Sequence, residues 1–401
     1  MWVKEMEPDV WARTRHICVA KDYVTVRLIG VLVTDPSDAS STDAYDLTTH
    51  AWSPRMLAAA EIDLELLPEI LPSTTVAGGL TVNAAEHTGL PVGTPVVVGG
   101  GDGPMASVGA GAITPADGAY VCLGSSAWVA FSAKQPLIDP LMRSFTFEHI
   151  APGYYSPTAT MQAGGASLHC LTDLLEPGVR ADRFSRLLAG TSTEPAARGG
   201  LFFLPYLLGE RSPHWNPAAA GSFVGLGRHH GRGDMVRAVL EGVAFNLRTC
   251  LTAFAENGVP ITQLDVIGGG ATSNAWLGIL ANVWGIPVRR RSIIEEANSL
   301  GAAVTALVGV GLADFSLART LSTVPTGASP NRCCRPVYSR ASPPTPRCCG
   351  APASLTGRLP HWWAGPPPRA QARCLFRRGT PILPRWRRAA VPSTSSGRTR
   401  W

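Results

Sequence analysis

The hydrophobic pattern alternates between short β-branched runs and longer stretches with apolar residues at helical spacing. Residues 94–112 read TPVVVGGGDGPMASVGAGA, which predicts a strand, a tight turn with an acid, and a helix of small residues. Residues 118–133 predict a hairpin around Gly124-Ser125-Ser126. Residues 263–285 again predict a strand, a triple glycine and a helix.

Four further segments have apolar positions at helical spacing: 55–71, 166–175, 235–258 and 295–311. The first should end at Leu71-Pro72, and the third at Asn257-Gly258, a typical C-terminal stop signal. Because strands alternate with helices, the chain should belong to the α/β class.

Composition fits a globular protein, with 45% hydrophobic residues and 42 glycines in 401 residues. This length allows two or three domains. No run of about 18 uninterrupted apolar residues appears, and the first residues lack the apolar core of a signal peptide. We therefore expect no membrane association and a cytoplasmic location.

Charge divides the chain in two. Fourteen of its 35 basic residues are arginines within 331–401, and no acidic residue follows Asp314. Residues 1–330 thus hold 21 basic and 29 acidic side chains, a net of −8, which argues against a nucleic-acid partner. From residue 327 the chain lacks hydrophobic periodicity and should have no stable fold. An out-of-frame reading of the gene explains that tail better than an Arg-rich nucleic-acid-binding arm.

Three glycine-rich turns follow the β-like runs, at Gly99–Asp102, Gly124–Ser126 and Gly268–Ala271. Glycine lets backbone N–H groups approach a ligand closely, and such groups favour anions. One such turn alone is better interpreted as a tight connection. Three of them, one with an aspartate, favour a ligand site.

Consecutive blocks along residues 5–325 resemble FGGY carbohydrate kinases: KDYVTVRLIGVLVTDPSDASSTDAYD, VVVGGGDGPMASVGAGA, LGSSAWV, TMQAGGAS, PYLLGERSPHWNPAAAGSFVGL and VIGGGATSNAWLGILANVWGIPV. The resemblance implies two actin-like ATPase (ribonuclease-H-like) domains, with sugar and ATP in the cleft between them. Residues 1–112 would form the C-terminal part of the sugar-binding domain and 113–326 the ATP-binding domain. Residues 327–401 would be the disordered or out-of-frame tail.

In this resemblance Asp102 matches the catalytic base, which takes the proton of the attacking sugar hydroxyl, and Asp102 and Gly103 contact the sugar. A structural alternative for Asp102 is a helix N-cap. The residues matching the nucleotide site are Gly124, Ser125, Ser126, Gly165, Gly269, Gly270, Ala271 and Asn274. His169 lies nearby, but a helix-surface histidine is an equally good interpretation.

Two further groups have open roles. Lys21, Asp22 and Ser37–Ser40 lie near where family members hold sugar, and a solvated loop explains them equally well. For Glu210, Arg211 and Trp215 we favour an interdomain ion pair with aromatic packing over catalysis.

The resemblance implies ATP-dependent phosphorylation of a sugar with Mg²⁺, most similar to the conversion of D-xylulose to D-xylulose 5-phosphate. The alternative is an inactive kinase fragment or incomplete gene product. The family's first phosphate turn, Asp-x-Gly-Thr, is not found here, so we expect an incomplete first domain and slow ATP turnover. Xylulose, ribulose, gluconate and glycerol kinases share these motifs, so the motifs do not identify the sugar. Whether the protein forms a homodimer is left open.

Overall fold

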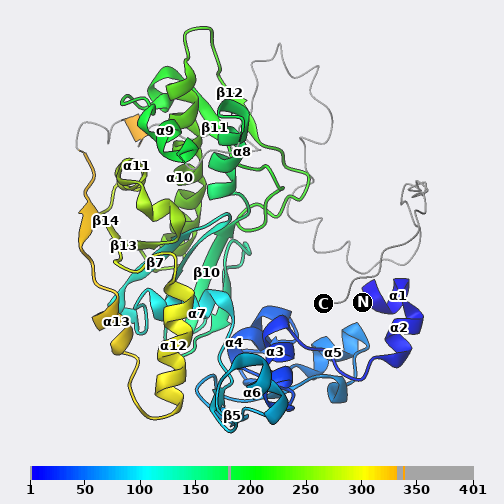
Figure 1. Ribbon diagram of the computed structural model, residues 1–401. Coiled ribbons are helices and arrows are strands. Elements are labelled where there is room, and N and C mark those ends of the chain that lie inside the picture. Colours follow the sequence, from blue (N-terminus) through cyan, green and yellow to red (C-terminus); the bar gives the residue numbers. More distant parts are fainter. Residues whose placement is uncertain (1, 179–181, 332–336, 339–401) are drawn as a thin grey trace, which may run out of the picture. The chain divides into compact units, whose positions relative to one another are not determined.

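The computed structural model describes residues 2–178, 182–331 and 337–338. Residues up to Val98 form short helices and short strands that pair two at a time, β1 with β4, β2 with β3 and β5 with β6 (Figure 1). Their bounds are α1 Trp2–Met6, α2 Pro8–Arg13, α3 Ala20–Ile29, β1 Val33–Thr34, α4 Pro36–Ala39, β2 Tyr45–Asp46, β3 Ala51–Trp52, α5 Pro54–Ala60, β4 Glu69–Ile70, β5 Val76–Gly79, α6 Val82–Thr88 and β6 Pro95–Val97.

The described residues after Val98 are built on a seven-stranded sheet in the order β15-β14-β13-β7-β8-β10-β9. The bounds there are α7 Asp102–Gly109, β7 Ala119–Leu123, β8 Ala127–Phe131, β9 Phe145–Glu148, β10 Tyr155–Met161, α8 Gly165–Leu175, α9 Arg183–Ala189, β11 Phe202–Leu204, β12 Ser222–Val224, α10 Arg232–Glu256, β13 Leu264–Ile267, α11 Asn274–Trp284, β14 Val288–Arg290, α12 Ala297–Gly309, α13 Leu317–Leu321 and β15 Thr326–Ala328. Strands β7, β13 and β14 run parallel. The other neighbouring pairs of this sheet are antiparallel.

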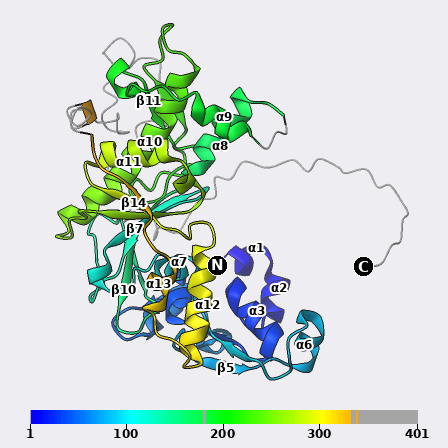
Figure 2. The same cartoon turned by 60° about the vertical axis from the view of Figure 1, so that its left-hand side comes forward.

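Strand β7 shows how the sheet is covered on both faces. Val121 and Leu123 belong to the core cluster that contains most of the buried apolar residues of α10. The alternate residues, Tyr120 and Cys122, pack in another cluster with residues of α7 and α12. Side chains of a strand point alternately to its two faces, so both faces of β7 are apolar and buried. Helices α7 and α12 lie side by side in both views (Figure 1, Figure 2).

Helix α10 is long and apolar enough to cross a membrane by length and composition alone. However, 78% of its most apolar stretch is buried inside the protein, and Val239, Leu240 and Phe254 are completely covered. The helix is therefore interpreted as the central core helix of this part of the molecule.

Most predicted elements are present: the strand, turn and helix of 94–112, the hairpin, and the helices α8, α10, α11 and α12. The helix predicted over 55–71 is wrong in its second half. Helix α5 ends at Ala60, because Glu61 takes a left-handed conformation with φ of 51°, and a short 3-10 turn and β4 follow. Pairing of β4 with β1 overrides the local helical spacing there.

The prediction of no stable fold from residue 327 is wrong for described residues after that point. Strand β15 pairs with β14, and Tyr338 is 1% exposed. The Tyr338 hydroxyl donates to Glu241 Oε1 at 2.7 Å and accepts from Arg237 Nη2 at 2.9 Å. The side chain of Tyr338 thus reaches the core although the sequence around it has no hydrophobic periodicity. Residues 332–336 and 339–401 lie outside the described residues, so the prediction for them is untested.

Candidate active site

Asp102 is the first residue of α7 and its side chain is exposed. The N-cap of this helix is Gly101, so the alternative of Asp102 as N-cap is wrong. Its Oδ1 accepts a hydrogen bond from Gly103 N at 2.7 Å, and its carbonyl accepts one from Asn298 Nδ2 at 3.2 Å. A carboxylate placed in this way is exposed to a substrate hydroxyl, while Gly103 N orients its side chain and Asn298 holds its backbone carbonyl.

The turn before Asp102 needs glycines because it passes over the buried side chains of Asp35 and Ser37. Gly99 has φ of +75°, and a Cβ added to Gly100 would lie 2.2 Å from Ile150 Cδ1 and 2.7 Å from Ser37 Oγ. The N–H of Gly101 donates to Ser37 Oγ at 2.9 Å. This turn is therefore held by close packing against the segment around α4.

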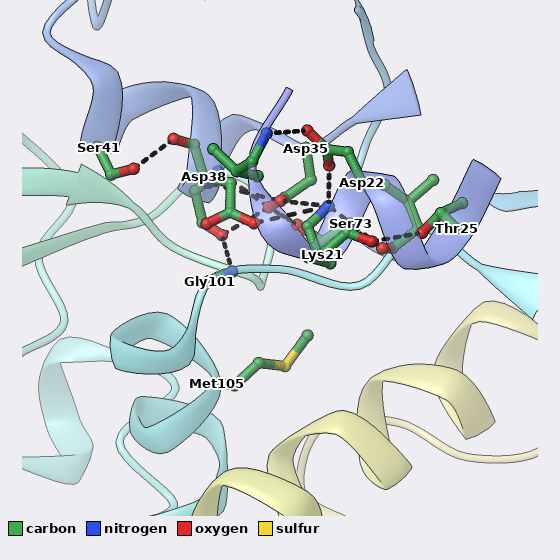
Figure 3. A network of polar contacts seen from close by, with 12 residues as sticks. Lys21, Asp22, Thr25, Asp35, Asp38, Ser41, Ser73, Gly101 and Met105 are labelled. Carbon is green, nitrogen blue, oxygen red and sulfur yellow. Dashed lines mark hydrogen bonds and ion pairs between the residues drawn. The ribbon is translucent and has the colours of Figure 1, made fainter. Parts of the chain in front are cut away.

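Lys21 stands at the centre of a group of three aspartates (Figure 3). Its Nζ lies 2.9 Å from Asp22 Oδ1, 3.3 Å from Asp35 Oδ1 and 3.7 Å from Asp38 Oδ2. Burial opposes the charged form of Lys21, but the three carboxylates outweigh it and raise its pKa. We call Lys21, Asp22, Asp35 and Asp38 the Lys21 cluster. The interpretation of Lys21, Asp22 and Ser37–Ser40 as a solvated loop is wrong, because Asp22 and Ser37 are each 1% exposed.

Asp38 is a carboxylate of the Lys21 cluster that lies beside the turn before Asp102. Burial, followed by the charge of Asp35, raises the pKa of Asp38 to about 6, and the charge of Asp102 adds to this. A Cβ on Gly101 would lie 2.8 Å from Asp38 Oδ1. Asp38 and Asp102 thus flank the same turn, and their negative charges oppose each other.

The second glycine turn, Gly124–Ser126, joins the N-terminus of α8. The N–H of Gly165 donates to Gly124 O at 2.8 Å, and that of Ala166 to Ser125 O at 3.0 Å. A Cβ on Gly164 would lie 2.9 Å from Ala127 Cβ, so this approach requires a glycine. The N–H of Ser167 donates to Gly164 O, so the first three N–H groups of α8 are occupied, and the exposed Ser125 lies beside them. An exposed turn with a glycine and two serines suits the phosphates of a nucleotide.

The third turn follows β13 as the second follows β7. These strands are parallel, with Ile267 opposite Cys122, so both turns leave the same edge of the sheet. A Cβ on Gly268 would lie 2.8 Å from the backbone of Leu123. The structure therefore brings together the two nucleotide turns that are far apart in sequence.

Within this third turn the side chains differ in accessibility. Gly269 and Asn274 are exposed, whereas Ala271 is completely buried in the core and only its backbone can face a ligand. The Asn274 Oδ1 accepts from Arg290 Nη1 at 3.1 Å. This bond fixes the amide so that its nitrogen is available as the donor to a purine.

Asp102 also lies near the second turn. The Gly103 carbonyl accepts a hydrogen bond from the Tyr120 hydroxyl of β7 at 3.0 Å. Burial raises the pKa of the Cys122 thiol to about 12, and the charge of Asp102 adds to that rise. Cys122 is two residues before Gly124, so the predicted base and the predicted phosphate turn meet at one end of β7.

His169 and the group around Glu210 make contacts that hold the structure together. His169 is exposed and makes an edge-to-face contact with Phe184 at 4.4 Å, as expected for a helix-surface histidine. The ion pair expected for Glu210 is not found among the described residues. Instead its buried carboxylate accepts from Gln162 N, Arg211 N and Asn246 Nδ2, each at 2.9 Å. Trp215 Nε1 donates to the Met142 carbonyl.

Asp35, Asn298 and Gly164 contribute to the site but were not predicted from the sequence. Gly164 was visible as half of a glycine pair, and Asp35 as an acid before Pro36, a common helix start. Asn298 gives no local signal, because it reaches Asp102 from α12, 196 residues away.

A separate cavity of about 920 Å³ lies at the opposite ends of β7 and β13. Its lining includes Asp117, Lys134, Gln263 and Arg289. The glycine turns are at the carboxyl ends of these strands, where α/β proteins bind ligands, so we place the site at the turns rather than in this cavity.

Comparison with known proteins identifies the class. The N-terminal domain model of the FGGY family of carbohydrate kinases matches residues 1–109, and its C-terminal domain model matches residues 119–310. The chain belongs to the FGGY family of carbohydrate kinases. The family predicted from the sequence motifs is confirmed.

Among curated relatives, the xylulose kinase of Lactococcus lactis is 34% identical over 317 residues, which cover 78% of this chain and 62% of the relative. Two solved structures from Lactobacillus acidophilus are each 27% identical with a TM-score of 0.77. The ligand-bound xylulose kinase is matched over 89% of this chain and 71% of its own. The gluconate kinase is matched over 88% and 70%. These likenesses confirm the predicted fold class of sugar kinases. The chain spans about 62% of the length of the first relative.

Proposed function

We propose that this protein transfers the γ-phosphoryl group of ATP to a sugar hydroxyl, and that the sugar is D-xylulose. The observation that carries this proposal is the exposed Asp102 carboxylate at the end of β7 where two glycine turns meet. The similarity to xylulose kinases supports the sugar, and the similarity to a gluconate kinase provides the competing substrate.

In the proposed reaction Asp102 accepts the proton of the sugar hydroxyl. The hydroxyl oxygen forms a bond to the γ-phosphorus, the bond from that phosphorus to the bridging oxygen breaks, and ADP leaves with the electron pair. Positioning and charge stabilisation account for most of the catalysis of such transfers. The exposed turn Gly124–Ser126 would hold the phosphates through its backbone and its serine hydroxyls.

Mg²⁺ would accompany ATP and neutralise charge on its phosphates. The described residues contain no group of three or more His, Cys, Asp or Glu side chains that could hold a metal ion. A magnesium ion can instead keep several waters and bind mainly through substrate phosphates, so no residue of this chain is assigned to it. Residues 113–326 would bind ATP, and residues 1–112 would bind the sugar. The reaction would take place in the cytoplasm, where ATP and the sugar are both available.

The test is sugar-dependent ADP formation by the full chain with Mg²⁺-ATP and, separately, D-xylulose, ribulose, gluconate and glycerol. We expect ADP formation to require a sugar, and kcat/KM to be highest for D-xylulose. A higher kcat/KM for gluconate would keep the kinase and replace the substrate. No sugar-dependent ADP with any of the four, together with retained ATP binding, would favour the inactive-fragment alternative.

A further inference from the structure

Ser37 connects a buried carboxylate to the turn that carries Asp102. Its Oγ donates to Asp35 Oδ2 at 2.6 Å and accepts from Gly101 N at 2.9 Å. Ser37 is 1% and Asp35 0% exposed. A serine hydroxyl has one proton, so donating it to the carboxylate leaves its lone pairs for the glycine N–H. The direction of the hydroxyl is therefore determined by Asp35.

Asp35 is itself fixed from several directions. Its Oδ2 also accepts from Ser37 N at 2.9 Å and from Ser73 Oγ at 2.8 Å, and its Oδ1 lies 3.3 Å from Lys21 Nζ. Removing the Ser37 hydroxyl would leave this carboxylate with its other partners. The same change would deprive the Gly101 N–H of its acceptor.

We propose that Ser37 is a positioning residue for Asp102, acting through Gly101, with Asp35 orienting its hydroxyl; the catalytic part of this inference rests on the proposed function. Gly101 is the N-cap of α7 and precedes Asp102 directly, so the bond to Ser37 fixes where the helix begins. A displacement of about 1 Å at a reacting group can cost on the order of 10²-fold in rate.

The test compares Ser37→Ala with Ser73→Ala in the full chain. Each change removes one buried hydroxyl hydrogen bond to the same Asp35 oxygen, but only Ser37 bonds Gly101. Amide hydrogen exchange at Gly101 and Gly103 reports the position of the turn without requiring activity. Steady-state kinetics with Mg²⁺-ATP and D-xylulose reports its effect on catalysis.

We expect Ser37→Ala to speed exchange at Gly101 at least about 10-fold and to lower kcat about 10- to 100-fold with KM for ATP unchanged. Ser73→Ala should change each quantity less than about threefold. In the unaltered protein Gly101 exchange should be slow, a measurement that does not require either variant to fold.

Rapid Gly101 exchange in the unaltered protein, or equal effects of the two variants, would overturn the positioning role. An unchanged kcat in Ser37→Ala with faster exchange would overturn its catalytic part. If the unaltered protein forms no sugar-dependent ADP, the proposed function fails, while the exchange comparison still decides whether Ser37 holds the turn.

Discussion

The two parts of this molecule are stabilised in different ways. From β7 onward, a seven-stranded sheet packs on α10 through apolar side chains such as Val121, Val239 and Leu264, all 0% exposed. Before β6, the strands pair only two at a time, and Lys21 is surrounded by buried aspartates. One part depends mainly on hydrophobic burial, which is nondirectional, whereas the other combines a small apolar cluster around Leu80, Ala84 and Ala85 with buried charges that require specific partners.

The largest effect should come from Lys21→Met. It leaves the buried Asp22 and Asp35 without their cation, and breaking a buried pair typically costs about 3–5 kcal/mol of the free energy of unfolding. Chemical denaturation at pH 7 measures this loss. Lys4→Met is the control, because Lys4 pairs with the exposed Glu61 and should leave the midpoint nearly unchanged.

Phe254→Ala sharpens the contrast between the two parts. Phe254 is 0% exposed and contacts Phe131 edge to face at 5.1 Å, so its loss should also cost about 3–5 kcal/mol. Burial raises the pKa of Asp38 and the charge of Lys21 opposes that rise, so without Lys21 this pKa should be higher and the defect of Lys21→Met should shrink as pH falls from 7 towards 4. The defect of Phe254→Ala should not depend on pH. Identical pH profiles would contradict the comparison.

Asp38→Asn should have a smaller effect of opposite sign. The folded-state pKa of Asp38 is raised to about 6 from 3.8, so the folded state binds a proton more readily than the unfolded state. The contribution of this group to stability therefore falls as pH rises from about 4 to about 6. Asn should stabilise the protein by about 1–3 kcal/mol at pH 7 and flatten its stability over that range. Denaturation midpoints at pH 4, 5, 6 and 7 measure this, and a loss of stability at pH 7 would refute it.

On the nucleotide side the decisive effect should be on ATP binding. A Cβ at Gly270 would lie 2.8 Å from Leu123 Cβ and 2.9 Å from Trp276 Cζ3, whereas one at Gly278 meets nothing within 4 Å. Gly270→Val should weaken ATP binding at least about 10-fold in calorimetry, because the turn must shift. Gly278→Ala should keep ATP affinity and add about 0.5–1 kcal/mol of helix stability. Equal ATP affinities in the two variants would place the nucleotide elsewhere.

The same contrast explains what could be predicted from the sequence. The hairpin of β7 and β8 and helices α10 and α11 are encoded by local periodicity, so their positions were predictable. The helix predicted over 55–71 was too long, because nothing in the sequence indicates that β4 pairs with β1. That pairing joins residues far apart in the chain.

Within the candidate site, the glycine turns were predictable because glycine is conspicuous in sequence. The contacts that hold Asp102 and the turn before it were not. Asn298 comes from α12, and Ser37 reaches Gly101 across 64 residues. No local pattern encodes either contact, since each depends on how separate elements pack.

The most direct test of the central claim is sugar-dependent ADP formation by Asp102→Asn, measured beside the unaltered protein with Mg²⁺-ATP and D-xylulose. Asparagine keeps the size of the side chain but cannot take a proton at neutral pH. We predict a loss of about 10²- to 10⁴-fold in kcat, with the Kd for ATP changed less than about threefold. Full turnover by Asp102→Asn would contradict the assignment of Asp102 as the base.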